Sequence, residues 1–133
     1  MKIAASDYFS ELEAEPTGES WNGLPFYKLL KPLTYYDDLI TVNAGFLTDF
    51  ASIPKGFRDK LPAFREYAPA AVVHDYLYST HTVSDRFTAD NIFLRAMKDC
   101  GTPWRGRWAM YLAVRLFGAA AWEIRIGWDP KAR

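Results

Sequence analysis

The chain has 133 residues, of which 50% are hydrophobic and 17% aromatic, so it has the composition of a globular domain and not of a disordered chain. Lysine and arginine together number 16, as do aspartate and glutamate, and this balance provides no general attraction to nucleic acid or to an anionic membrane. Cys100 is the only cysteine, which excludes a disulfide framework within the chain.

Residues 1–20 are polar and acidic and contain Pro16 and Gly18. This composition predicts an irregular arm, with one short strand near Ile3. The segment has no apolar run of the length that a signal peptide needs. We therefore expect the protein to be made in the cytoplasm and to leave it only as part of an assembly.

Residues 21–68 have the pattern of a small antiparallel sheet followed by a loop. Runs rich in aromatic and β-branched residues at 26–30, 33–36 and 39–42 predict strands, and a turn is expected at 43–45.

The loop that follows, residues 45–62, contains too many glycines and prolines for regular structure. It concentrates small polar side chains, namely Thr48, Asp49 and Ser52. Asp49 either bonds to backbone amides of its own loop, as turn aspartates do, or contributes to a functional site.

Residues 69–133 form the predicted helical half of the domain. Pro69 opens the first helix, because the N–H that proline lacks would be unpaired there anyway. Along this helix His74 and Tyr78 share one face, and Asp75 lies one step round.

The second helix is predicted to begin with Ser84 as N-cap and to end before Gly101. Asp90 lies within its apolar stripe, which also contains Phe87, Phe93, Leu94 and Met97. A buried carboxylate is costly unless it is paired. His74 on the facing helix is the most suitable partner, since the chain has only two histidines.

A third helix is expected from Trp104 to about Trp122, after the N-cap Thr102. Its middle, WAMYLAVRLFGAAAW, is apolar almost all round and has Arg115 at its centre. This pattern predicts a central core helix; the alternative is a helix whose second face docks on a partner subunit or a lipid surface. It is too short to span a bilayer, which takes roughly 20 apolar residues.

These elements predict an α+β fold in a single domain of residues 1–133. A small antiparallel sheet from the N-terminal half packs with a three-helix C-terminal half that carries His74 and Asp90.

The pair of His74 and Asp90 has the composition of a general base, in which the carboxylate fixes the tautomer of the imidazole and stabilises its charged form. No strong nucleophile lies beside His74 in the sequence, so the attacking group would be water. Asp75 is then available for a hard cation such as calcium, with backbone carbonyls of residues 45–56 as further ligands. Zinc fits less well, because His81 would have to supply a third ligand from the turn.

The segment from His74 to Tyr78, a polar turn, and the run Ala89-Asp90-Asn91-Ile92-Phe93 resemble the paired helices of phospholipase A2. The resemblance implies that His74 activates water and that Asp75 binds calcium. It also implies that Asp90 orients the histidine, with Tyr78 as its hydrogen-bond partner.

Over nearly the whole length, GFLTDFASIP, AAVVHDYLY and the third predicted helix are similar to a family of uncharacterised tailed-phage and prophage proteins, catalogued as a domain of unknown function. This resemblance implies a viral or prophage origin, with synthesis in the host cytoplasm or a place in the virion tail. It also implies a shared site, made of Asp49, Ser52, His74, Asp75 and Asp90.

Two functions remain open from the sequence. The first is a metal-assisted hydrolase of an ester or amide of the bacterial envelope, a phospholipid or peptidoglycan. The second is a non-enzymatic tail, baseplate or assembly protein, in which the same residues form a structural network. The expected partners are phage structural proteins or envelope components, with peripheral lipid contact, no transmembrane segment and no nucleic acid.

Overall fold

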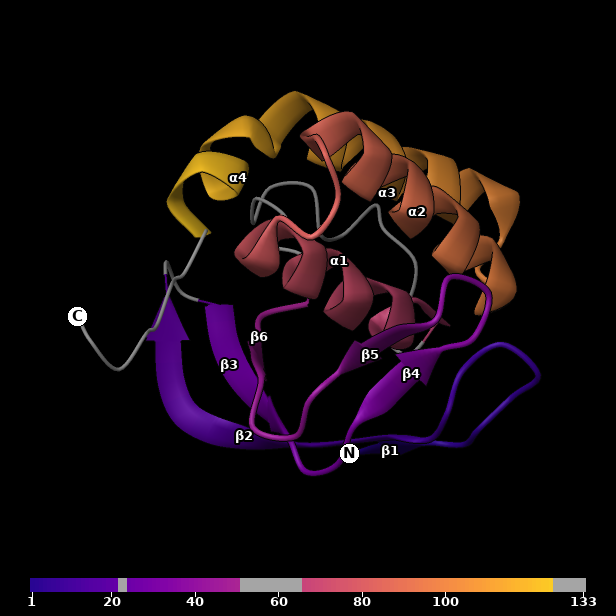
Figure 1. Cartoon of the computed structure of the whole chain (residues 1–133), viewed down its shortest axis with the longest axis vertical. Helices are drawn as coiled ribbons and strands as arrows, with labels where there is room; N and C mark the ends of the chain where they lie inside the picture. The colour runs from indigo at the N-terminus through magenta and orange to yellow at the C-terminus, as the bar shows by residue number, and fades with distance from the viewer. Residues whose placement is uncertain (22–23, 51–65, 126–133) are drawn as a thin grey trace.

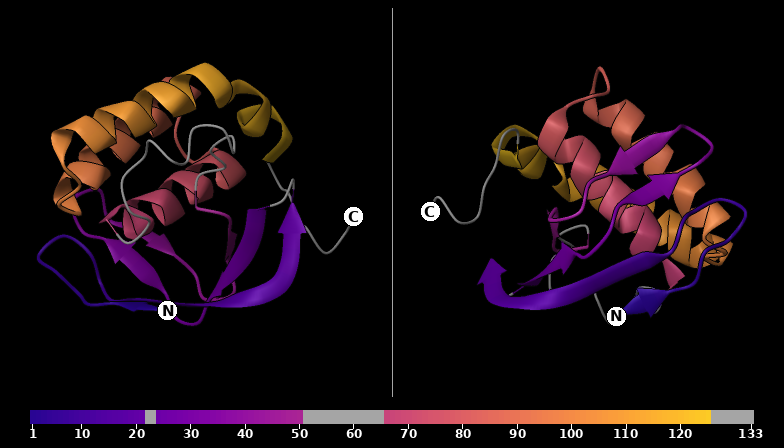
Figure 2. Two further views of the ribbon diagram at one scale, coloured as in Figure 1. Left: turned by 180° about the vertical axis from the view of Figure 1, so that it is seen from behind. Right: turned by 60° about the horizontal axis from the view of Figure 1, so that its bottom comes forward.

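The computed structural model describes residues 1–21, 24–50 and 66–125, and it confirms the α+β fold. The strands lie on one side of the molecule, helix α1 occupies the middle, and helices α2, α3 and α4 cover its other side (Figure 1). The view from behind shows the same order of layers (Figure 2). The central position therefore belongs to α1, the helix that carries His74.

Two antiparallel sheets form the N-terminal half. The larger has the strand order β1-β2-β3-β6 and the smaller pairs β4 with β5. The strands are β1 Lys2–Ile3, β2 Leu12–Trp21, β3 Leu24–Leu29, β4 Leu33–Tyr35, β5 Ile40–Val42 and β6 Leu47–Thr48. The three predicted strands correspond to β3, β4 and β5, while β6 is a short strand within the loop that was expected to be irregular.

The prediction of an irregular arm over residues 1–20 is wrong for the second half of this range, because residues 12–20 belong to β2. Leu12 and Ala14 are fully buried, so packing against the core draws this segment into the sheet. Among the described strands, β1 pairs with β2 only at residues 12 and 13. Beyond these residues this side of β2 is an edge of the sheet, and an edge strand tolerates a proline such as Pro16. The short strand expected near Ile3 is confirmed as β1.

Helix α1, Ala68–Thr80, has a proline in its first turn, as predicted from Pro69. His81 ends the helix in a left-handed conformation, with φ of 51°, and its N–H bonds to the carbonyl of Leu77. Ten of its residues are buried, among them Ala70, Ala71, Val72, Val73, His74 and Asp75. Such a helix is covered on several sides, and its buried His74 and Asp75 side chains must find partners within the protein.

Helix α2, Arg86–Asp99, begins one residue later than expected. Asp85 is its N-cap and accepts a hydrogen bond from the Thr88 amide at 2.7 Å, so the assignment of this role to Ser84 is wrong. Gly101 follows the helix with φ of +84°, the left-handed conformation that glycine adopts at little cost, as predicted.

The third predicted helix is divided into α3, Trp104–Phe117, and α4, Ala119–Arg125, which meet at Gly118. The prediction of a central core helix is wrong. Only Met110, Ala113 and Val114 of α3 are buried, and α3 lies in the outer layer (Figure 2). None of the helices in the described ranges is long and apolar enough to cross a membrane.

Gly118 allows close packing at the junction of α3 and α4. A Cβ atom at this position would lie 2.4 Å from the Val114 carbonyl oxygen and 2.7 Å from the Tyr78 hydroxyl. We expect Gly118→Ala to lower the free energy of unfolding by about 1–3 kcal/mol through overpacking, measured by urea denaturation. Gly101→Ala is the control: its positive φ strains the backbone, but nothing lies within 4 Å of the added carbon. A larger loss at Gly101 would contradict the packing argument.

Candidate functional site

The Asp90 carboxylate is fully buried and lies at the centre of the helical layers. Its Oδ1 atom is 2.8 Å from Nε2 of His74 and accepts a hydrogen bond of 2.6 Å from the Tyr78 hydroxyl. Both partners come from α1 and are four residues apart, so they share a face as the sequence predicts. The expected contact of Asp90 with His74 and Tyr78 is therefore present.

Two arginines complete the coordination of this carboxylate. Arg115 of α3 donates to Oδ2 of Asp90 at 2.8 Å, and Arg86 donates to the same oxygen at 3.4 Å. Sequence analysis missed both. Arg115 did carry a signal, because a cation in the middle of an apolar helix requires a partner, and Arg86 stands one helical turn before Asp90.

The aromatic rings around His74 keep the pair in an apolar environment. The His74 ring centroid lies 4.2 Å from that of Tyr78 and 4.4 Å from that of Phe93. His74 is only 3% exposed. Electrostatic interactions are stronger in such surroundings than in water, so the carboxylate has a strong influence on the imidazole.

Burial by itself raises the pKa of Asp90, but the hydrogen bonds from His74, Tyr78 and Arg115 outweigh this effect and hold the pKa below its usual value. Asp90 is therefore a carboxylate at neutral pH. Burial raises the pKa of the Tyr78 hydroxyl, and the hydrogen bond to Asp90 raises it further, so Tyr78 is a neutral donor.

Asp75 faces a different layer from His74, although the two are adjacent in the sequence. Its Oδ2 atom accepts hydrogen bonds from the Thr48 hydroxyl at 2.5 Å and from the Asp49 amide at 3.2 Å. Thr48 belongs to β6, so this contact joins α1 to the larger sheet. The structure thus places the backbone amide of Asp49 against the Asp75 carboxylate. Ser52, which was also predicted for this site, lies outside the described residues.

The groups described around the Asp75 carboxylate are the Thr48 hydroxyl and the Asp49 amide, and both donate hydrogen bonds to it. The Asp75 carboxylate and that of Asp49, which is 6% exposed, offer oxygen atoms, the ligands that calcium prefers. No three His, Cys, Asp or Glu side chains in the described part of the chain form a group that could hold a metal. Calcium would therefore depend on backbone carbonyls in addition to these carboxylates. His81 instead stacks on Trp122, and its Nε2 lies 2.9 Å from the Trp122 carbonyl oxygen.

A cavity of about 400 Å³ lies between β5 and the turn that joins α1 and α2. Its lining includes Asp38, Ile40, Leu77, Val83 and Ile92. None of His74, Asp75 and Asp90 contributes to it. The cavity is therefore separate from the network around Asp90.

Comparison with protein families gives a match over residues 27–114 to the family described as "Protein of unknown function (DUF1353)". The matched range contains His74, Asp75 and Asp90 and extends from β3 to the end region of α3. No curated protein and no solved structure matches the chain.

The low pKa of Asp90 makes a pH-dependent contribution to stability. Because the carboxylate is charged in the folded protein at lower pH than in the unfolded chain, this contribution is present above about pH 4 and is lost as pH falls further. We expect Asp90→Asn to lower the free energy of unfolding by about 2–4 kcal/mol at pH 7, measured by urea denaturation. Below about pH 4 the free energy of unfolding of this variant should fall less steeply than that of the wild type, in urea titrations at each pH. Asp7→Asn changes an exposed carboxylate and is the control. An unaltered acid profile in Asp90→Asn would contradict the assignment.

Proposed function

The chain belongs to the DUF1353 family of proteins of unknown function, and we propose from its site that it is a hydrolase in which His74 activates water. The contact of His74 Nε2 with the buried Asp90 carboxylate at 2.8 Å is the observation that carries this proposal. With Nε2 directed to Asp90, the nitrogen that would take a proton from water is Nδ1, which is buried, so water would have to enter the protein interior to reach it.

Three features support a role for His74 as a base. Asp90 is ionised, so it stabilises the imidazolium that forms when His74 accepts a proton. Tyr78 and Arg115 fix the carboxylate, so the imidazole keeps one tautomer and one orientation. Proton transfer by a group positioned in this way contributes about 10²–10⁴-fold to a rate.

Asp75 is the proposed ligand of a calcium ion, together with the Asp49 carboxylate and backbone carbonyls of the adjacent loop. Calcium in this place would polarise the carbonyl oxygen of a substrate. His74 and Asp75 are neighbours on one rigid helix, so the base and the cation would keep a fixed separation. This arrangement supports hydrolysis of an ester or amide.

The proposed substrate is an ester of the bacterial envelope, and the most specific form of this proposal is a phospholipid. The pairing of Asp90 with His74 and Tyr78 matches what the resemblance to phospholipase A2 implies for these positions. A phage or prophage origin, inferred from the sequence pattern, is consistent with an envelope target. The alternative substrate for a phage product is peptidoglycan.

A second candidate is a non-enzymatic phage tail, baseplate or assembly protein, and the buried network around Asp90 supports a structural role of this kind. Asp90 accepts hydrogen bonds from four side chains on three helices, and a buried network of this kind specifies the packing of its elements. In that case His74→Ala lowers stability by a few kcal/mol, while the wild-type protein has no turnover.

Replacement of the base tests the enzymatic proposal. We expect His74→Gln to fold and to lose at least about 100-fold of the rate of fatty acid release from phosphatidylglycerol in calcium, because glutamine cannot accept the proton. His81→Gln alters the other histidine, which bonds to α4, and should keep the wild-type rate. Equal rates of fatty acid release in wild type and His74→Gln would refute the hydrolase. A wild-type protein that neither releases fatty acid from this lipid nor cleaves peptidoglycan would refute it as well.

Chelation tests the metal separately. We expect a calcium chelator to lower the melting temperature of the wild-type protein but not that of Asp75→Asn, because a bound ion stabilises only the state that holds it. Asp7→Asn should respond as the wild type does. A wild-type melting temperature that is unchanged by chelator and by added calcium would exclude the proposed ion.

A further inference from the structure

The outer face of α3 carries large apolar side chains that remain exposed. Trp104, Trp108, Leu112 and Leu116 follow one another at intervals of four residues and are 61%, 46%, 56% and 74% exposed. We refer to these four side chains as the α3 ridge. At 1.5 Å per residue the ridge is about 18 Å long, and the helix packs on the core through its opposite face.

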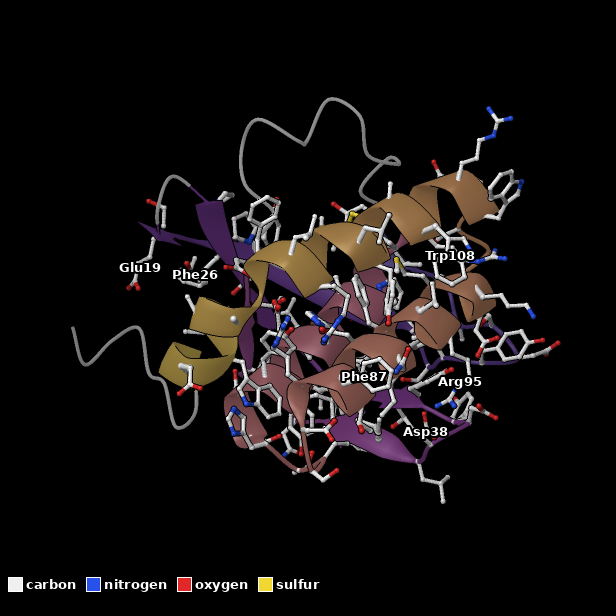
Figure 3. The ribbon with its side chains drawn as sticks, turned by 90° about the horizontal axis from the view of Figure 1, so that it is seen from above. Glu19, Phe26, Asp38, Phe87, Arg95 and Trp108 are labelled. Atoms are coloured by element: carbon white, nitrogen blue, oxygen red, sulfur yellow. The ribbon has the colours of Figure 1, made fainter. Side chains whose placement is uncertain are left out.

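The apolar surface continues onto the neighbouring helix. Phe87 of α2 is 56% exposed, and its ring centroid lies 5.2 Å from the guanidinium carbon of Arg115. In the view from above, Trp108 and Phe87 both appear on the outer surface of the helical layer (Figure 3). Exposed apolar groups that gather in this way usually mark an interaction surface.

All the charges on α3 are positive. The helix contains Arg105, Arg107 and Arg115 and has no acidic residue. The Arg105 guanidinium lies 5.4 Å from the Trp104 ring centroid, so a cation accompanies the N-terminal end of the ridge. Because Arg115 is paired with Asp90, the local positive charge at this surface comes from Arg105 and Arg107, although the chain as a whole is balanced.

We propose that the α3 ridge docks on an anionic lipid surface. The helix would lie in the plane of the interface, with its leucines among the acyl chains and its tryptophans at the level of the headgroups. Arginine side chains extend along such a surface and bring their charge to lipid phosphates. This docking concerns residues other than His74, Asp75 and Asp90 and does not depend on hydrolysis.

A second copy of the chain is a less suitable occupant of the same face. Two ridges that pack on each other would bring together helices that carry arginines and no acidic residue. Like charges across an interface are unfavourable, whereas lipid phosphates supply the opposite charge. Charge complementarity therefore favours the anionic lipid surface.

Sedimentation with vesicles of ether-linked lipids tests this proposal without any ester to hydrolyse. We expect the full chain to bind phosphatidylglycerol vesicles much more tightly than phosphatidylcholine vesicles. Leu116→Asn should weaken binding about tenfold, because an apolar group leaves the interface. Arg105→Gln should weaken it about fivefold, because a charge close to the anionic surface is lost.

Leu39→Asn is the matched control, because Leu39 is 82% exposed in the turn between β4 and β5 and its φ of 52° suits asparagine. It should bind as the wild type does. Failure of the wild type to bind phosphatidylglycerol, equal binding to both lipids, or equal weakening by Leu39→Asn would overturn the proposal. A wild-type dimer that Leu116→Asn converts to monomer, without vesicle binding, would assign the ridge to a second copy and also overturn it.

Discussion

The burial of one negative charge at Asp90 determines how the helical half is assembled. A carboxylate without exposed surface is tolerated only when its oxygens are paired, and here α1, α2 and α3 all provide donors. Arg86 also donates hydrogen bonds to the carbonyl oxygens of Val114 and Arg115 near the end of α3. The same cation therefore serves the carboxylate and the terminal carbonyls of a helix, close to the point where Gly118 separates α3 from α4.

The central helix α1 distributes two ionisable neighbours between two layers. Successive residues of a helix point about 100° apart, so His74 is directed to α2 while Asp75 is directed to β6. Because α1 is buried along most of its length, neither side chain can turn to solvent. The pair is thus held with the precision that a catalytic site needs, and the same rigidity would serve a purely structural network.

The contacts within the helix pair could be predicted from sequence because helical spacing is local. His74 and Tyr78 share a face in any α-helix, and an aspartate in the apolar stripe of the next helix needs a partner. The pairing of Arg115 with Asp90 could not be predicted in the same way, since it depends on how α3 crosses α2. Strand β2 was missed because Pro16 and Gly18 argue against a strand locally, whereas burial of its first half is a tertiary effect.

The wrong prediction of a central core helix in the region of α3 has a separate physical explanation. A high apolar content favours burial of a helix face, but it does not show whether the rest of the same chain or another surface covers that face. Helix α1 has alanines and valines that let the neighbouring layers approach closely, and it takes the centre. Helix α3 has tryptophans and leucines that remain exposed on its outer face.

Arg115 connects the buried network around Asp90 with the exposed outer face of α3. Its guanidinium is 2.8 Å from the Asp90 carboxylate and also lies beside Phe87 at the outer surface. A displacement of α3 by about 1 Å would lengthen this contact beyond the range of a hydrogen bond. If α3 docks on lipid as proposed, the docked helix would therefore hold or shift a donor of the carboxylate that orients His74. The geometry of the buried pair and the state of the outer surface are then coupled through one side chain.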